Sequence, residues 1–359
     1  MIKIDRYISR TVVLAMLLVL LVLASLDLVF TLFDEIGDTG DRYRSMDALL
    51  YVLLTFPRHL YELLPMAALM GALVGLGVMA SSNELVIMRA AGVRVSRIVW
   101  AVMKPTALVM VAGLVLGEFM APPLELRAEV HKALANADGG EMILSRYGHW
   151  LREGEAYMHF NAIEADGVLH GVSIYRFDAG KQLVSSTFAE KAVYQQQGSW
   201  LLENVSESVF VETDGQSKSF NTFYIEKTWA VDLVPELLRV LIMDPDKMAI
   251  SDLYRYARRF ETQGQDGNQY YLAFWKKMLQ PLTTAVLVLV AIAFVFGPLR
   301  EATMGSRVFV AICFGLLFII LQRLLNTLSL VFQLDPLLAV LLPILLTAVA
   351  GSWLLRRAA

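Results

Sequence analysis

Cysteine is nearly absent from this 359-residue chain, and there is no excess of basic charge. The single cysteine, Cys313, excludes an intramolecular disulfide and a cysteine-based metal site. Five histidines are scattered without the spacing of metal ligands, so we predict no metal site. A net charge of -3 and a pI near 6.0 give no sign of the clustered basic side chains that bind nucleic acid.

Motifs of known catalytic sites are absent as well. The sequence contains no Gly-x-x-x-x-Gly-Lys-Ser/Thr phosphate loop, and therefore no recognisable ATP cradle. It also contains no Gly-x-Ser-x-Gly elbow and no His-Glu-x-x-His zinc motif. We therefore predict no catalytic residue and no cofactor in this chain, and we expect it not to be an enzyme.

Apolar side chains, in contrast, are more abundant than one water-soluble core needs. They make up 57% of the sequence, and the mean hydropathy is +0.54. A helix needs roughly 20 mostly apolar residues to cross the hydrocarbon core of a bilayer. Six stretches meet this condition, and we predict a transmembrane helix in each: Val12 to Phe33, Leu63 to Ala80, Ile98 to Met120, Leu272 to Phe296, Val308 to Leu328 and Leu337 to Leu355.

The first two spans need separate interpretation. The first apolar stretch is too long, and too poorly bounded by small residues, for a cleaved signal peptide, so we interpret it as a retained span. Before the second span, the apolar segment Leu49 to Phe56 is followed by Pro57, Arg58 and His59. Because proline disrupts a helix interior, this segment is either a kinked extension of the span or an interfacial segment, and we do not expect a straight helix.

Basic side chains gather on one side of the predicted spans. Lysines and arginines precede the first span, follow the second and fourth spans, and end the sequence, whereas the opposite side is mainly acidic. Positively charged short loops stay in the cytoplasm. We therefore expect a multi-pass membrane protein with both termini in the cytoplasm and the long connection between the third and fourth spans outside.

That long connection has a β pattern. From Gly148 to about Glu226, short runs of β-branched and aromatic residues alternate with turn signals such as Thr213-Asp214-Gly215. This spacing predicts an antiparallel sandwich or jelly-roll domain, and Ser251 to Glu261 then shows a helical pattern. The predicted organisation is an α-helical membrane protein with three parts: transmembrane helices at 1–123, the β domain with a connecting helix at 124–269, and transmembrane helices at 270–359.

The most distinctive motif covers the second predicted span and the loop after it. Leu64-Pro65-Met66-Ala67-Ala68 leads through Gly71, Gly75 and Gly77 to Ser82-Asn83-Glu84-Leu85-Val86-Ile87-Met88-Arg89-Ala90-Ala91-Gly92-Val93. Glycines at this spacing let helices approach closely, so we interpret them as packing residues. The stretch resembles the LptF/LptG family of permeases, the membrane subunits of the ABC exporter that moves lipopolysaccharide from the inner membrane toward the outer membrane.

Shorter motifs extend the resemblance over essentially the whole chain. Three features are closer to LptG members than to LptF members: the motif at residues 5–8, the Gly-Glu-x-x-Ala-Pro sequence within residues 117–122, and the short C-terminus. The resemblance implies a bacterial inner-membrane location, with a jelly-roll domain in the periplasm. The motifs are Asp5-Arg6-Tyr7-Ile8, Gly117-Glu118-Phe119-Met120-Ala121-Pro122 and Phe296-Gly297-Pro298-Leu299-Arg300.

The resemblance also implies partners. In the family, an LptF-type and an LptG-type subunit enclose a cavity, and a dimer of the cytoplasmic ATPase LptB binds the ATP and drives them. The jelly-roll domain passes lipid to LptC and the periplasmic bridge. The implied function is a permease subunit that extracts lipopolysaccharide from the inner membrane and hydrolyses no ATP itself.

The segment near 82–92 corresponds to the coupling helix of the family, which lies in a groove of the ATPase. The glutamate that matches the family's polar contact is Glu84, and Arg89 is a second expected coupling residue. Two plainer interpretations stay open. An acidic residue near a helix N-terminus favours the helix dipole, and Arg89, like Arg94 and Arg97, fits retention of positive charge in the cytoplasm.

Basic residues also occur just beyond the third span. Arg127, His131 and Lys132 fall at i, i+4 and i+5, which on a continuing helix makes one basic face at the outer membrane surface. We expect this face to bind lipopolysaccharide phosphates, although nonspecific contact with lipid head groups is the alternative. The family has lysines near the outer end of the first span, but Thr31 to Asp38 has none, so other residues or a bridging divalent cation must handle substrate phosphate.

Two ionisable residues lie inside predicted spans, Asp27 in the first and Arg323 in the fifth. Each lies about 15 residues from the cytoplasmic start of its span, which places both at a similar depth. Because a lone charge is costly in a bilayer, we expect Arg323 to face the cavity and bind substrate phosphate. Asp27 is then its counter-ion or a partner for the second permease subunit. Snorkelling of Arg323 to the head groups is the alternative.

Other functions remain in competition with an LptG-type permease. One is the LptF-type partner of the same complex. Another is a lipoprotein-releasing or macrolide-type ABC permease, but those families place their large insert after the first of four spans, whereas three predicted spans precede it here. An intramembrane enzyme would need a polar dyad deep in neighbouring spans, and an ion-coupled carrier would need intramembrane carboxylates.

Overall fold

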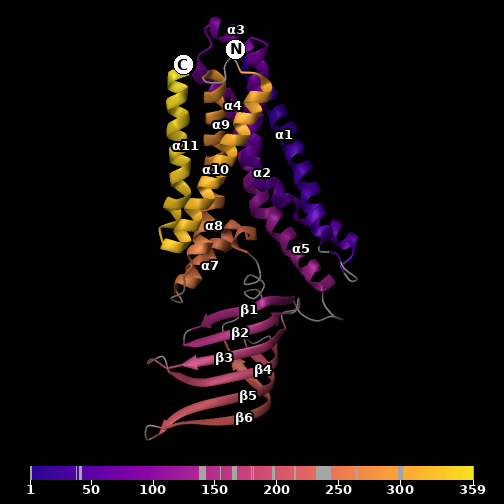
Figure 1. The fold of residues 1–359 in the computed structure, drawn as a ribbon, viewed down its shortest axis with the longest axis vertical. Coiled ribbons are helices and arrows are strands. Elements are labelled where there is room, and N and C mark those ends of the chain that lie inside the picture. The colour runs from indigo at the N-terminus through magenta and orange to yellow at the C-terminus, as the bar shows by residue number, and fades with distance from the viewer. Residues whose placement is uncertain are drawn as a thin grey trace.

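A helical bundle forms one end of the molecule and a β-sheet forms the other (Figure 1). The computed structural model describes residues 2–37, 39, 43–136, 143–153, 155–163, 168–178, 180, 182–195, 199–213, 216–231, 244–262, 266–297 and 302–358. Both chain ends lie at the end of the bundle farthest from the sheet (Figure 1). The short helix α3, Glu84–Ala90, lies beside them (Figure 1).

The part of the chain before the sheet is almost entirely helical. It contains α1 (Ile2–Gly37) and α2 (Ser45–Ser81), and after α3 comes α4 (Val95–Val115). A single π-helical turn, η1 (Leu116–Met120), connects α4 to α5 (Ala121–Asn136). The helix therefore continues well beyond the third predicted span, and α5 carries the basic residues expected at the outer membrane surface.

The part after the sheet begins with short connecting helices. These are η2, a 3-10 turn (Pro245–Lys247), and α7 (Ile250–Thr262). The bundle then resumes with α8 (Asn268–Met278) and α9 (Gln280–Phe296). Pro281 stands in the first turn of α9, where a proline is tolerated because its missing N–H would be unpaired anyway. The last helices are α10 (Met304–Phe332) and α11 (Pro336–Ala358).

Five described helices or helical runs are long and apolar enough to cross a membrane. They are α1, α2, the run from α4 into α5, α10 and α11. The pair α8 and α9, bent by 48°, is the sixth candidate. All six predicted stretches lie on these helices, so the helical membrane part of the predicted fold is confirmed.

The segment before the second span is part of α2. The structure continues α2 as one helix through Pro57 and Pro65, so the interfacial alternative for Leu49 to Phe56 is wrong. α2 packs against α1, α5, α9 and α10. These neighbours supply tertiary contacts that outweigh the local preference of proline for a helix end.

Glycines bring α1 close to α2. A Cβ atom built on Gly71 would lie 2.4 Å from the Cα of Met16, and one on Gly75 would lie 3.1 Å from the Cα of Val12. No other residue fits such an approach without displacing the backbone of α1. The packing interpretation of these span-two glycines is therefore confirmed.

The insert is one antiparallel sheet of six strands in sequential order. Each strand pairs only with its neighbours in sequence, so the described strands form a meander. The predicted antiparallel domain is confirmed, whereas the crossing connections of a jelly roll are not found among the described strands, because each hairpin returns directly. The strands are β1 (Ile143–Glu153), β2 (Ala156–Ile163), β3 (Leu169–Phe177), β4 (Leu183–Gln195), β5 (Ser199–Thr213) and β6 (Gln216–Ala230).

The sheet has a hydrophobic core of its own. Phe160, Val172 and Trp200 are buried in it, and none of its members belongs to the core cluster of the helical bundle. A third, smaller cluster joins α7 to α8 through Leu253 and Tyr270. Helix α7 therefore lies in a layer between the bundle and the sheet and packs on α8 through a small core of its own, while α8 also reaches the core of the bundle through Leu272 (Figure 1).

Candidate functional sites at the two ends of the bundle

The helix α3 projects at the end of the bundle that carries the chain termini (Figure 1). Asn83 before it has a φ of 61°, and Gly92 after it has a φ of 85°. Asparagine and glycine tolerate this left-handed conformation, which separates α3 from α2 and α4. Leu85 is buried, but Val86 and Ile87 are 45% and 65% exposed. This exposed apolar pair is suited to contact with a partner protein.

Glu84 begins α3, where its charge favours the helix dipole. Its carboxylate lies beside the hydroxyl of Tyr7 in α1. One carboxylate oxygen, Oε2, is buried and has no hydrogen-bond partner among the described residues. The predicted coupling glutamate therefore faces α1, with one buried carboxylate oxygen that no described residue contacts by a hydrogen bond.

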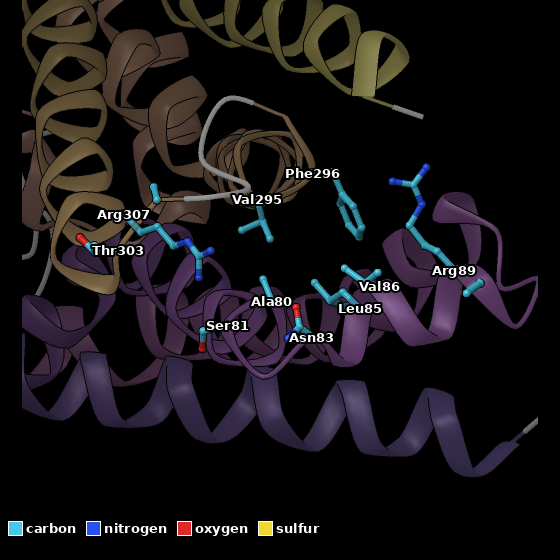
Figure 2. A pocket seen from close by; sticks show the side chains of 12 residues that line it. Ala80, Ser81, Asn83, Leu85, Val86, Arg89, Val295, Phe296, Thr303 and Arg307 are labelled. Atoms are coloured by element: carbon cyan, nitrogen blue, oxygen red, sulfur yellow. The ribbon is translucent and has the colours of Figure 1, made fainter.

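Arg89 lies on a different side of α3. It lines a cavity of about 860 Å³ between α3 and the adjoining ends of α9 and α10, opposite Phe296 (Figure 2). Arg307, at the inner wall, is only 2% exposed and donates a hydrogen bond from Nη1 to the carbonyl oxygen of Gly77. The two expected coupling residues are therefore not adjacent contacts: Glu84 is turned toward α1 and Arg89 toward the cavity.

At the opposite end of the bundle, the carboxylate of Asp27 is paired with a histidine ring. Its Oδ2 lies 2.7 Å from Nδ1 of His59 in α2. Arg323 is exposed on α10, and no ion pair joins it to Asp27 in the described part of the chain. The expected counter-ion pair is therefore corrected: within this chain His59 is the partner of Asp27, because α1 packs along α2.

Lys132 is held in a cage formed by α1, α2 and Tyr43, which lies just before α2. Its Nζ lies 2.6 Å from Oε1 of Glu35, 5.6 Å from the ring centroid of Tyr43 and 5.0 Å from that of Tyr51. The hydroxyl of Tyr43 donates a hydrogen bond of 2.6 Å to the same Glu35 oxygen. Burial and the neighbouring carboxylate raise the pKa of Tyr43 far above its usual range, so Tyr43 acts as a donor at every ordinary pH.

The three basic residues of α5 therefore do not form one uniform face. Arg127 is exposed. His131 is half-buried, with Nε2 3.6 Å from Oδ1 of Asp47, and Lys132 is committed to the cage. The spacing i, i+4, i+5 placed all three on one side of a helix, but it did not show that α1 and α2 would cover part of that side.

A second polar network was missed by the sequence analysis. Glu125 is fully buried, and it lies 3.1 Å from Nε of Arg58 and 3.4 Å from Nζ of Lys247. Lys247 also donates a hydrogen bond to Glu129. Burial alone would lower the pKa of Lys247, but the hydrogen bond and the carboxylates of Glu129 and Glu125 outweigh it and raise the pKa above 10.5. The network joins α2, α5 and η2.

The comparison with known proteins covers nearly the whole chain. The family described as "Lipopolysaccharide export system permease LptF/LptG" matches residues 6–357. The lipopolysaccharide export system permease protein LptG of Escherichia coli (strain K12) is 34% identical over 355 residues, and that of Haemophilus influenzae is 32% identical over 355 residues. In both pairs the alignment covers 98% of each chain. The chain belongs to the LptF/LptG family.

As a member of the LptF/LptG family, the chain is a multi-pass inner-membrane protein of the permease type. The family resemblance inferred from the motifs is confirmed, and so is its closer relation to LptG members, since the relatives are LptG proteins. Among the described residues, no three potential ligands converge on a point that suits a metal ion.

The structure explains two motifs of this LptF/LptG chain. In the opening tetrad, the carboxylate of Asp5 accepts hydrogen bonds of 2.8 and 3.0 Å from Nε and Nη2 of Arg97, a bidentate pair that ties α1 to α4. In the Gly-Glu-x-x-Ala-Pro motif, Gly117 makes room for Tyr61, because a Cβ atom there would lie 2.6 Å from its ring.

The glutamate of the second motif caps a helix from a different part of the LptF/LptG chain. The carboxylate of Glu118 accepts hydrogen bonds of 2.7 and 3.3 Å from the backbone N–H groups of Ile250 and Ser251. These groups belong to the first turn of α7, which has no internal partners for them. The motif therefore joins the end of the third span to the layer between the bundle and the sheet.

Proposed function

We propose that this chain is a permease subunit that extracts lipopolysaccharide from the inner membrane and passes it toward the outer membrane, as part of an ABC exporter. The observation that carries the proposal is the family match across residues 6–357, because it includes the membrane bundle, α3, the connecting layer and the sheet together. The relatives named as lipopolysaccharide export permeases share 98% of their length with this chain, which supports the same activity.

The proposed orientation puts α3 and both termini in the cytoplasm and the sheet in the periplasm. Arg89 lies in α3, and Arg94 and Arg97 lie at the start of α4. The last turn of α11, at the same end of the bundle, carries Arg356 and Arg357 (Figure 1). Positive charge in short loops favours the cytoplasmic side. The sheet, at the other end, then lies in the space that an exported lipid must enter.

The proposed coupling surface is α3. The exposed side chains of Val86 and Ile87 provide apolar contact for a groove of a separate LptB-type ATPase, and Glu84 at the start of the helix is assigned the polar contact. Arg89, on the cavity side of α3, is assigned a second contact. In this account ATP is bound by the ATPase partner, and the chain itself has neither a cofactor nor an ATPase site.

The proposed substrate surface consists of the outward faces of α1 and α10. Leu21 and Phe30 on α1 are each 67% exposed, and Leu317 on α10 is 62% exposed. Such apolar faces accept acyl chains by burial, at about 0.8 kcal/mol for each CH2 group. We assign the second wall of this cavity to an LptF-type partner, with LptC and the periplasmic bridge as the next acceptors.

Polar groups near the outer end of this surface are assigned to the lipid head. Arg323 is exposed on α10 and Arg127 is exposed on α5, so both are placed to contact phosphate. His131 and Lys132 are assigned to hold the adjacent part of α5 in position. The Asp27–His59 pair provides polar groups on α1 and α2 in the same account. A photo-crosslinker at position 323 tests this: lipopolysaccharide adducts support the assignment, and adducts with bulk phospholipid alone contradict it.

Co-expression tests the function as a whole. The chain is purified from membranes with and without an LptF-type subunit and LptB. The proposal predicts a stable complex of all three, and ATPase activity that depends on lipopolysaccharide only when this chain is present. If the chain purifies alone under every condition, or if ATPase activity appears without the ATPase subunit, the proposal fails.

A further inference from the structure

Helix α7 lies in the layer between the bundle and the sheet (Figure 1), and it carries a basic groove. The groove is shallow, with a volume of about 450 Å³, and three of its lining residues are arginines. The opposite side of α7 is occupied, because Leu253 and Ala257 are fully buried in the cluster with α8. The lining residues are Ser251, Tyr254, Arg255, Arg258, Arg259 and Thr262.

The carboxylates of α7 do not balance this charge. Asp252 lies 3.5 Å from Arg255, but both side chains are exposed, at 43% and 74%, so the pair is weak. Glu261 is turned toward α8, where its carboxylate accepts a hydrogen bond of 2.9 Å from the hydroxyl of Tyr271. Arg255 and Arg258 are both exposed in the groove and give it a positive face.

The groove is held in a fixed place. Its first residue, Ser251, belongs to the turn that Glu118 caps from the third span. Next along the helix, the ring of Tyr254 lies 5.4 Å from that of Phe274 and 6.5 Å from that of Tyr271. Both rings belong to α8, which leads directly into the span formed with α9. The arginines are therefore presented by a braced helix at the outer mouth of the bundle.

We propose that this α7 groove binds phosphate groups of the lipopolysaccharide head as the lipid passes from the bundle to the sheet. The inference rests on the proposed function. Arginine matches phosphate because its planar guanidinium donates two parallel hydrogen bonds, and three arginines at positions i, i+3 and i+4 share one side of a helix. The layer carrying α7 lies between the membrane helices and the strands, so a head group on that route meets these arginines (Figure 1).

The test uses the complete complex of this chain with an LptF-type subunit and LptB in proteoliposomes of phosphatidylethanolamine and phosphatidylglycerol that contain lipopolysaccharide. The double variant Arg255→Gln/Arg258→Gln changes two exposed arginines. We expect ATP-dependent release of lipopolysaccharide to a periplasmic acceptor to fall by about tenfold, the effect of losing one charge-assisted contact. The matched control, Arg356→Gln, changes an exposed arginine in the last turn of α11, at the other end of the bundle, and is expected to release lipid at the wild-type rate.

A photo-crosslinker at position 258 identifies the occupant. Adducts with lipopolysaccharide that appear with ATP support the proposal, and adducts with phosphatidylglycerol alone overturn it. Wild-type release by the double variant, at wild-type yield of assembled complex, also overturns it. If the wild-type complex itself releases no lipopolysaccharide, the proposed function has failed and this inference fails with it.

Discussion

Glu118 accepts a hydrogen bond of 2.7 Å from the backbone N–H of Ile250, a residue 132 positions further along the chain. A carboxylate at this point satisfies N–H groups that the first turn of α7 leaves free, and its charge favours the positive end of the helix dipole. The position of α7 therefore depends on a side chain from the third span.

Replacing Glu118 with Ala is expected to lower the stability of the connecting layer by about 0.5–2 kcal/mol, the usual cost of removing a helix cap. Limited proteolysis of the full-length protein in detergent measures the effect as faster cleavage within 244–262. Glu118→Gln keeps a hydrogen-bond acceptor, so its cleavage rate is expected to lie between those of wild type and Glu118→Ala. Equal cleavage rates for wild type and Glu118→Ala would show that the cap does not hold α7.

The coupling role of Glu84 predicts a loss of ATPase binding. Glu84→Ala removes the carboxylate at the start of α3 and is expected to weaken the complex with the ATPase by about 1.5–3 kcal/mol, as for one charge-assisted hydrogen bond. Co-purification at falling ATPase concentration measures this. Tyr7→Phe removes the neighbouring hydroxyl and leaves the carboxylate, so it is expected to bind normally; if it weakens binding as much, Glu84 acts only by packing against α1.

Two basic residues of α5, the caged Lys132 and the exposed Arg127, are expected to cause different defects when they are replaced. Lys132→Gln leaves the buried carboxylate of Glu35 without its cation, and we expect a loss of stability of about 2 kcal/mol in thermal unfolding. Arg127→Gln changes an exposed side chain, so unfolding is expected to stay at the wild-type temperature while ATPase stimulation by lipopolysaccharide decreases. The opposite distribution of defects would reverse these assignments.

Lys247 predicts an alkaline limit to the stability of the outer polar network. Its pKa is raised above 10.5 in the folded chain, so the folded state binds the proton more tightly than the unfolded state. The stabilisation is complete below an unfolded-state pKa of about 10.4 and is lost as the pH rises through the higher folded value. Wild type is expected to unfold at a higher temperature than Lys247→Gln at pH 8. This difference in unfolding temperature is expected to close as the pH rises above the pKa of Lys247 in the folded chain. A constant gap up to pH 12 would contradict this account.

The sequence predicted the parts of the structure that depend on local pattern. Long apolar runs identified the spans, alternating runs with Asp-Gly turns identified the strands, and Gly71 and Gly75 identified a close helix contact. These signals lie within one element or one hairpin, where the spacing of residues determines what they face. The short helix near 82–92 was expected from the resemblance to the LptF/LptG family, and α3 lies there.

The contacts that the sequence did not predict all join residues far apart in the chain. The contacts of Glu118 with Ile250, and of Glu125 with Lys247, join the third span to a layer that follows the sheet. Pairing of Asp27 with His59 instead of Arg323 depends on which helix packs beside α1, and one sequence does not contain that information. The sequence alone leaves the segment before Pro57 open between a helical extension and an interfacial segment, and the packing of α2 against its neighbours decides for the helix.

ATP-driven release of lipopolysaccharide from proteoliposomes tests the central claim most directly. Vesicles contain lipopolysaccharide, an LptF-type subunit and LptB, with or without this chain, and a periplasmic acceptor collects released lipid. The account predicts release that needs ATP and this chain together, and that falls when Glu84 is replaced with Ala. Equal release in vesicles that lack this chain, or release that continues without ATP, would contradict it.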